Sequence, residues 1–181
     1  MPGDSITFFD PFTSMRSEWT FVGATATLTA NDRLAVDASG NGYWRMELPP
    51  ATAQDSYAIG VHITSVGTSQ PAIKLHVKDS AATATMYCEL FQPSTRFALT
   101  YTPDTVNYTQ LAGASIQTPL GPGVLALDMI QHPTQIVCDT SWPVSLPSIT
   151  AGRPAINIAT MWLELWDGTF EIDYFVRIHS M

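Results

Sequence analysis

Charged residues are scarce in this chain: they make up only 13% of its 181 positions, about half the usual share of roughly 25%. The eight lysines and arginines form no cluster, and the formal net charge is −8. Nucleic-acid binding needs a basic stripe, and binding to an anionic membrane surface needs a basic segment, so both functions are disfavoured. We therefore expect a surface of mostly uncharged polar side chains, as in extracellular β-proteins and in virion components.

Long apolar runs are also missing. No stretch reaches the roughly 20 apolar residues that a membrane-spanning helix needs, so we expect no membrane insertion. Met1 is followed by Pro-Gly-Asp-Ser, which lacks the basic and apolar regions of a signal peptide, so we expect synthesis in a cytoplasm without a cleaved signal. Apolar residues nowhere recur at helical spacing over three turns, and no helix is predicted.

Cysteine is nearly absent. Cys88 and Cys138 lie in the strand-like runs MYCELF and QIVCDT. They form one disulfide if these strands are neighbours, but two buried free thiols are the favoured interpretation. No metal-ligand spacing surrounds either cysteine or any of the four histidines, and no nucleophile motif occurs. We therefore expect no metal site, no cofactor and no catalytic residue.

Alternation of apolar and polar residues is abundant. In 56–66, Tyr57, Ile59, Val61 and Ile63 alternate with small or polar residues, and 72–78 repeats the pattern. About a dozen such segments are separated by turn residues, while 102–122 and 141–154 read as irregular loops. This arrangement predicts an all-β fold, a two-sheet antiparallel β-sandwich or jelly roll. We expect a single domain over 1–181, with 1–20 as a candidate extended N-terminal arm.

The strongest local pattern is 160–180, TMWLELWDGTFEIDYFVRIHS, where Asp-Gly between two alternating runs predicts a β-hairpin. Residues at every second position of its second arm should face the core: Phe170, Ile172, Tyr174, Val176 and Ile178. The pairing places Glu164 opposite Glu171, and Trp162 opposite Asp173, with Trp166 beside them. The predicted outer face of the hairpin is thus an aromatic and acidic strip.

Two interpretations of this strip are open. Indole rings stack on the C–H faces of sugars and carboxylates accept hydrogen bonds from hydroxyls, so the strip suits a carbohydrate. Alternatively, another strand, a loop or a neighbouring subunit covers it, because tryptophan usually marks buried or interface area. Tyr43 and Trp44, after a Gly-Asn-Gly loop, join the candidate ligand contacts, with a packed tryptophan in a hairpin as the alternative. A further hypothesis makes Glu164 and Glu171 a retaining-glycosidase pair.

Both ends of the chain carry a resemblance. The opening FFDPFTSMRSEWTFVGATATLTANDRLAVDA, the paired segments DSYAIGVHITSVG and AIKLHVKDS, and the ending FEIDYFVRIHS resemble concanavalin A-like lectin/glucanase domains. The chain is also similar to modules in bacteriophage minor tail proteins. The resemblance implies two antiparallel sheets, one of them concave and carrying the sugar or the catalytic strand. Glucanase members carry E-x-D-x-(x)-E, but Glu171-Ile172-Asp173 is followed by Tyr174-Phe175-Val176, so the catalytic motif is absent as a unit.

These features lead us to expect a non-enzymatic virion structural protein, a bacteriophage minor tail or decoration protein located in the virion. Its expected partners are other virion proteins, further copies in a homotrimer or ring, and host-surface glycans. The alternatives are a carbohydrate-binding module and, less favoured, a glycoside hydrolase. The candidate carbohydrate contacts are Trp162, Glu164, Trp166, Glu171, Asp173, Tyr43 and Trp44.

Overall fold

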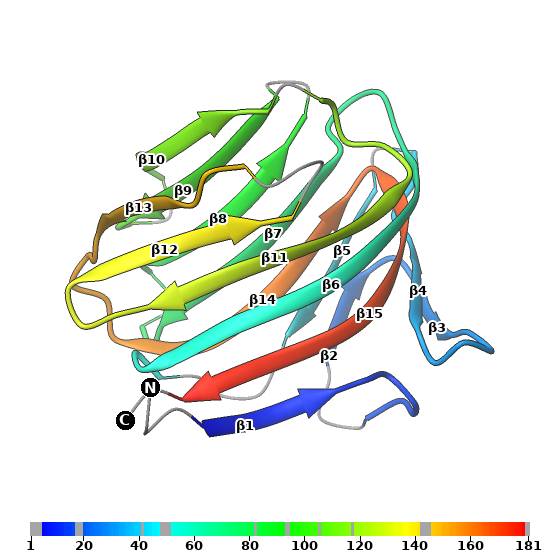
Figure 1. The fold of residues 1–181 in the computed structure, drawn as a ribbon, viewed down its shortest axis with the longest axis horizontal. Coiled ribbons are helices and arrows are strands. Elements are labelled where there is room, and N and C mark those ends of the chain that lie inside the picture. Colours follow the sequence, from blue (N-terminus) through cyan, green and yellow to red (C-terminus); the bar gives the residue numbers. More distant parts are fainter. Residues whose placement is uncertain are drawn as a thin grey trace.

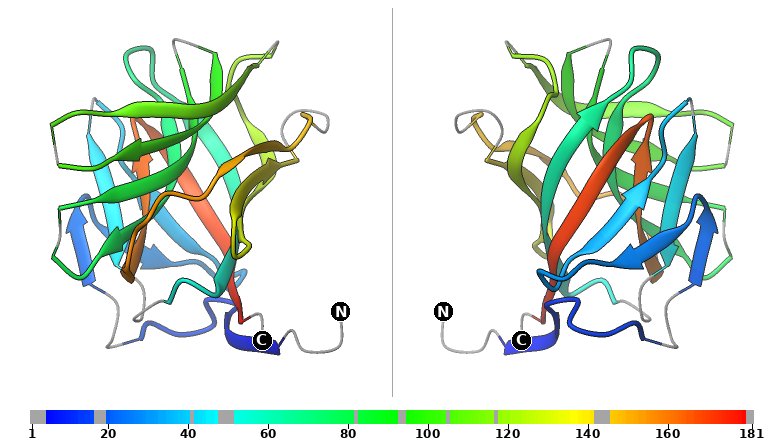
Figure 2. Two further views of the ribbon diagram at one scale, coloured as in Figure 1. Left: turned by 90° about the vertical axis from the view of Figure 1, so that its left-hand side faces the viewer. Right: turned by 90° about the vertical axis from the view of Figure 1, so that its right-hand side faces the viewer.

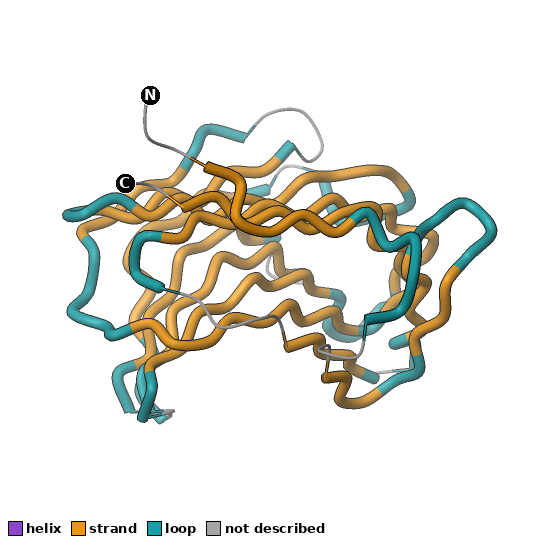
Figure 3. Tube along the Cα trace, turned by 90° about the horizontal axis from the view of Figure 1, so that it is seen from below, coloured by secondary structure: helices purple, strands orange, loops and turns teal. Residues whose placement is uncertain are grey.

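A computed structural model describes residues 5–16, 20–40, 42–47, 52–81, 83–92, 95–104, 106–116, 118–141 and 146–179. These ranges contain fifteen β-strands and no helix, so they hold no helix that could cross a membrane. All strand pairs are antiparallel, and the strands form two stacked sheets (Figures 1 and 3). The predicted all-β, two-sheet sandwich is confirmed.

The eight-stranded sheet has the order β13-β12-β11-β6-β15-β4-β3, and β1 also pairs with β15. Its strands are β1 (Ser5–Asp10), β3 (Ala26–Leu28), β4 (Leu34–Asp37), β6 (Asp55–Val66), β11 (Gly123–Gln131), β12 (Gln135–Thr140), β13 (Ile149–Gly152) and β15 (Gly168–His179). The seven-stranded sheet has the order β10-β9-β8-β7-β14-β5-β2. Its strands are β2 (Thr20–Gly23), β5 (Tyr43–Glu47), β7 (Ala72–Asp79), β8 (Thr85–Phe91), β9 (Arg96–Thr102), β10 (Thr109–Ser115) and β14 (Ile158–Trp166).

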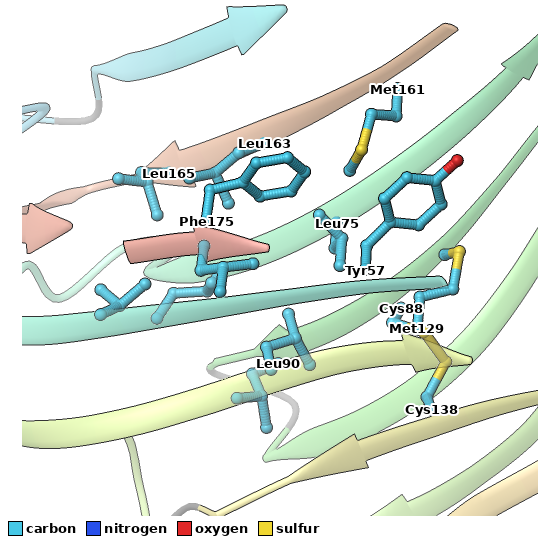
Figure 4. Close-up of a cluster of buried hydrophobic side chains, with 14 of the residues drawn as sticks. Tyr57, Leu75, Cys88, Leu90, Met129, Cys138, Met161, Leu163, Leu165 and Phe175 are labelled. Carbon is cyan, nitrogen blue, oxygen red and sulfur yellow. A yellow bond between two sulfur atoms is a disulfide. The ribbon is translucent and has the colours of Figure 1, made fainter. Parts of the chain in front are cut away.

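The core lies between the two sheets and is built by the alternation visible in the sequence. On β6, Tyr57, Ile59, Val61 and Ile63 are all buried, as predicted. Figure 4 shows Tyr57 and Phe175 from one sheet among Leu75, Leu163 and other apolar side chains from the other. Each strand therefore has one face in the core and one outer face, and only outer-face residues are available for binding.

The predicted terminal hairpin is wrong. β14 pairs with β5 and β7 in the seven-stranded sheet, whereas β15 pairs with β4 and β6 in the eight-stranded sheet. Asp167, at a φ of 48°, is the single residue linking them, so the chain crosses from one sheet to the other there (Figure 2). Gly168 fits this crossing because a Cβ on it would approach Ser65 O to 2.7 Å. The predicted cross-strand pairs, including Glu164 with Glu171, do not form.

The strict alternation expected in β15 is also interrupted. The pairing of β15 with β6 slips between Ile172 and Tyr174, which is the signature of a β-bulge. Phe170, Ile172 and then Phe175 are buried in the core, while Tyr174 pairs with Gly60 and stays half-buried. The expectation that Tyr174, Val176 and Ile178 continue the core face is therefore wrong beyond Ile172.

Two segments expected as loops contain edge strands, β10 within 102–122 and β13 within 141–154. The favoured free thiols are wrong as well: Cys88 of β8 and Cys138 of β12 are disulfide-bonded, with their Cα atoms 5.8 Å apart (Figure 4). Because these two strands belong to different sheets, the bond connects the sheets through the core. The candidate arm 1–20 includes β1, which pairs with β15, while 1–4 and 17–19 lie outside the described residues.

Candidate functional site

The predicted strip is divided between the two outer faces of the sandwich. Trp162, Glu164 and Trp166 of β14 lie on the outer face of the seven-stranded sheet. Glu171 and Asp173 of β15 lie on the opposite side, on the outer face of the eight-stranded sheet, where both bind Arg33. Stacked sheets are about 10 Å apart even at their backbones, so Glu164 and Glu171 are not a glycosidase pair.

The outer face of the seven-stranded sheet gathers most of the candidates, and we call its outward side chains the aromatic face. Cross-strand pairing sets its rows: Glu164 lies between Arg45 and Lys74, and Trp166 lies beside Tyr43. Cross-strand pairs extend these rows from β7 to β8 and from β8 to β9. The face comprises Tyr43, Arg45, Glu47, Lys74, His76, Lys78, Tyr87, Glu89, Phe91, Arg96, Thr100, Trp162, Glu164 and Trp166.

Glu164 organises the two indoles of this face. Its carboxylate accepts a hydrogen bond from Trp162 Nε1 at 2.8 Å and another from Trp166 Nε1 at 3.2 Å. Strand residues two apart share a face, which is why Trp-x-Glu-x-Trp places one indole on each side of the acid. Burial alone would raise the pKa of Glu164, but the neighbouring His76 and the hydrogen bonds from Trp162 and Trp166 lower that pKa to about 2. Glu164 is therefore a fixed carboxylate that sets the orientation of both rings.

His76 fills the space beside Trp162. Its ring stacks on the indole with centroids 4.7 Å apart and lies 4.7 Å from the ring of Tyr87 on the other side. Its Nε2 is 3.3 Å from Glu164 Oε2. Burial lowers the pKa of His76 by more than Glu164 raises it, so the imidazole is neutral at pH 7. Three adjacent strands thus present one continuous layer of stacked rings.

A second carboxylate, Glu89 of β8, is almost completely buried on this face. Arg96 Nη2 hydrogen-bonds to its Oε1, Lys74 Nζ lies 3.6 Å from its Oε2, and the Thr100 hydroxyl is 3.4 Å from its Oε1. A buried charge is tolerated only when it is paired and hydrogen-bonded, and these three donors meet that need. Sequence reasoning missed Glu89, His76 and Lys74 as site residues, because only the strand order brings β7 beside β14 and β8 beside β7.

Tyr43 and Trp44 lie on opposite sides of β5. Tyr43 is partly exposed and stacks on Trp166 with ring centroids 5.0 Å apart, so it belongs to the aromatic face. Trp44 points inward, is fully buried and stacks on Phe21 at 5.5 Å. The structure therefore removes Trp44 from the candidate contacts and supports the alternative of a packed core tryptophan.

A hollow of about 300 Å³ opens at the end of the aromatic face next to Trp162. The indole lines it together with Arg45, Glu47, Lys78, Asp79, Ser80, Ala159 and Thr160. The Arg45 guanidinium lies 5.5 Å and the Lys78 ammonium 5.6 Å from the centre of the Trp162 ring system. This hollow combines an aromatic wall, two hydroxyls, two cations and two carboxylates, which are groups that fix the orientation of a polar ligand.

The opposite outer face carries a tightly paired cluster around Arg33. Arg33 bonds Asp173 Oδ1 at 2.6 Å and Glu171 Oε2 at 3.0 Å, and His62 Nδ1 lies 3.4 Å from the same Glu171 oxygen. The hydrogen bond from Arg33 lowers the pKa of Glu171. The two acids are thus occupied by a cation. Within the described ranges, no three His, Cys, Asp or Glu side chains gather as metal ligands do.

Comparisons with known proteins identify the fold. No family model matches the sequence, and no curated protein matches it. Among solved structures, the carbohydrate binding module CBM66 from Bacillus subtilis aligns with a TM-score of 0.64 and 14% identity over 90% of this chain and 96% of its own. The Ca²⁺-bound exoplasmic/lumenal domain of VIP36 gives 0.69 and 10% over 95% and 89%. The Bacillus licheniformis β-glucanase gives 0.64 and 12% over 96% and 98%.

These structures are lectin-like and glucanase sandwiches, and each aligns over nearly its whole length. At these identities the likeness establishes architecture and not activity. The resemblance read from the sequence is thereby confirmed at the level of fold: the chain is a jelly-roll sandwich of the concanavalin A-like lectin/glucanase fold.

Proposed function

We propose that this protein is a non-enzymatic carbohydrate-binding protein whose binding surface is the aromatic face. The observation that carries the proposal is the Trp162–Glu164–Trp166 unit, in which one ionised carboxylate holds two indoles on the outer face of the seven-stranded sheet. A sugar offers an apolar C–H face and a rim of hydroxyls, and it needs aromatic rings with polar groups at fixed positions beside them.

The partly exposed end of this unit is Trp166 with Tyr43 stacked against it. The two rings are pre-positioned by Glu164 and by cross-strand pairing, so little side-chain entropy is lost when a ligand binds. Lys74, at 5.6 Å from the Trp166 ring, and Arg45 on the neighbouring strand supply hydrogen-bond donors. Binding modules are also found among proteins of this fold, since CBM66 is a carbohydrate binding module by name.

The chemistry of the face favours binding over catalysis. A glycosidase needs a protonated acid next to a second carboxylate, and the environments of the two must separate their pKa values. Glu164 has a pKa of about 2 and cannot act as a general acid near neutral pH. Glu89 is enclosed by Arg96, Lys74 and Thr100, so a glycosidic oxygen cannot reach it. Neither carboxylate of the central rows has the properties of an acid catalyst.

The virion assignment forms the second part of the proposal. Disulfides persist mainly outside reducing cytoplasms, and Cys88–Cys138 therefore supports work in an oxidising environment, which is compatible with a particle that adsorbs to cells. In this proposal the protein is a minor tail or decoration component that contacts host-surface glycans, assembled as a trimer or ring. Light scattering on purified protein tests the assembly: a trimer or larger ring is expected, and a strict monomer that never accompanies particles argues against this part.

The binding proposal is tested with a broad glycan array. Wild-type protein should give a specific signal, and Trp166→Ala should weaken it at least roughly tenfold, about 1.4 kcal/mol, the scale of an aromatic anchor. Tyr174→Ala is the matched control because Tyr174 is a half-buried aromatic residue outside the aromatic face, on the eight-stranded sheet. Equal loss in both variants, or no signal from folded wild type, would refute the proposal.

A further inference from the structure

The positive charges of the protein are concentrated on the aromatic face. The chain has eight lysines and arginines and a net charge of −8. Four of those cations belong to this one face, with only three carboxylates: the cations are Arg45, Lys74, Lys78 and Arg96, and the acids are Glu47, Glu89 and Glu164. This face of an otherwise acidic protein therefore carries an excess of one positive charge among the described residues.

The acids and cations of the aromatic face differ in how exposed their side chains are. The side chains of Glu89 and Glu164 are only 2% and 15% exposed, whereas those of Arg96 and Arg45 are 33% and 30% exposed. The two acids lie underneath and are satisfied by donors of the face itself, while the cations stand above them. A ligand approaching the central rows thus meets Arg96 and Arg45 before Glu89 and Glu164, whereas Glu47 is more exposed than either arginine.

Two of these cations, Lys78 and Arg45, line the hollow beside Trp162. Lys78 has no carboxylate within ion-pair distance among the described residues, and its ammonium lies over the Trp162 ring. Arg45 pairs through Nη2 with Glu47, which also lines the hollow, and the buried Nε of Arg45 has no hydrogen-bond partner in the described part of the chain. Asp79, which also borders the hollow, is occupied by hydrogen bonds from Thr83 and Ala84 in the following turn.

We infer that this hollow binds a carboxylated sugar residue, a uronic acid or a sialic acid, within the glycan. The inference rests on the proposed carbohydrate-binding function and specifies its ligand. The sugar carboxylate pairs with Lys78 and Arg45, its ring lies against the Trp162 edge of the layer of stacked rings, and its hydroxyls reach Ser80 and Thr160. The volume of about 300 Å³ is at the small end for ligand sites, which suits one monosaccharide unit.

The test compares matched probes that differ only in charge. Oligogalacturonate is measured against its neutral methyl ester, and sialyllactose against the methyl ester of its sialic acid carboxylate, by isothermal titration calorimetry with the full chain. Wild type should bind at least one acidic probe roughly tenfold or more tightly than its neutral partner, since a charge-assisted hydrogen bond has about that effect. The probe pair that shows the preference distinguishes uronic from sialic acid.

Lys78→Gln should abolish the preference, so that within this variant the acidic and the neutral probe bind equally tightly. Arg33→Gln, which removes a cation from the opposite sheet, is the control and should retain the preference. Equal binding of acidic and neutral probes, sensitive to Trp166→Ala, would overturn this inference and leave the proposed function standing. No binding of either type, together with a silent array, would overturn both.

Discussion

Removal of the Cys88–Cys138 disulfide should lower the free energy of unfolding by an amount that the length of the closed loop sets. The bond closes a loop of 50 residues between strands of different sheets. Closing a loop of that length lowers the entropy of the unfolded chain by about 14 cal/mol/K. Cys88→Ala/Cys138→Ala removes this restriction, so its free energy of unfolding should be lower by about 4 kcal/mol at 25 °C. For a domain of this size the melting temperature should fall by roughly 8–16 °C.

Urea unfolding followed by tryptophan fluorescence measures this effect. Wild type unfolded with and without a strong thiol reductant is the control, because reduction of the unfolded chain removes the loop term without changing any side chain. The double variant and the reduced wild type should lose similar free energies of unfolding. If neither differs from the oxidised wild type, the two thiols are not bonded and the cross-sheet connection is wrong.

Two other predictions concern single aspartates. Burial, and then the charge of Asp139, raise the pKa of Asp128 to about 6, so ionisation of Asp128 disfavours the fold as pH rises from about 4 to above 6. After allowance for partial exposure, Asp128→Asn should be about 1–2 kcal/mol more stable than wild type at pH 7.5, and the two should be equally stable at pH 3.5. Urea unfolding at both pH values measures this, and a stability difference that is the same at both would contradict it. Asp167 accepts backbone hydrogen bonds from Ser69 and Gln70 at a positive φ, so Asp167→Ala should cost about 2–3 kcal/mol in thermal unfolding. Asp167→Asn tolerates the same φ and should cost less; an equal loss would show that the backbone conformation does not matter.

Alternation within each strand is a local property, and it was readable from the sequence. The core faces of β6 and β7 follow from every second residue, and the same rule put Trp162, Glu164 and Trp166 on one side of β14. The edge strands β10 and β13 were missed because small or turn-forming residues weaken their alternation. Local pattern therefore predicted which residues share a face.

Which strands pair depends on the whole chain, and here the local sequence pattern predicted the wrong pairing for β14 and β15. Asp167-Gly168 signals a sharp turn, but nothing local tells whether the chain returns in the same sheet or crosses to the other. Because the chain crosses to the other sheet, Glu164 and Glu171 lie on different sheets. The bulge at Asp173 is similarly invisible, since one unpaired residue moves all that follow to the other face. His76 joined the site only through the neighbour order of β7 and β14.

The location of the binding surface is tested most directly by recording the indole N–H resonances of ¹⁵N-tryptophan-labelled protein during titration with an array-positive oligosaccharide. Trp44, buried between the sheets, is an internal reference in the same molecule. We expect large shifts at Trp162 and Trp166, whose indole N–H groups donate to Glu164, and little change at Trp44. Saturable binding that leaves the Trp162 and Trp166 resonances unshifted would show that the sugar binds elsewhere and that the aromatic face is not the binding surface.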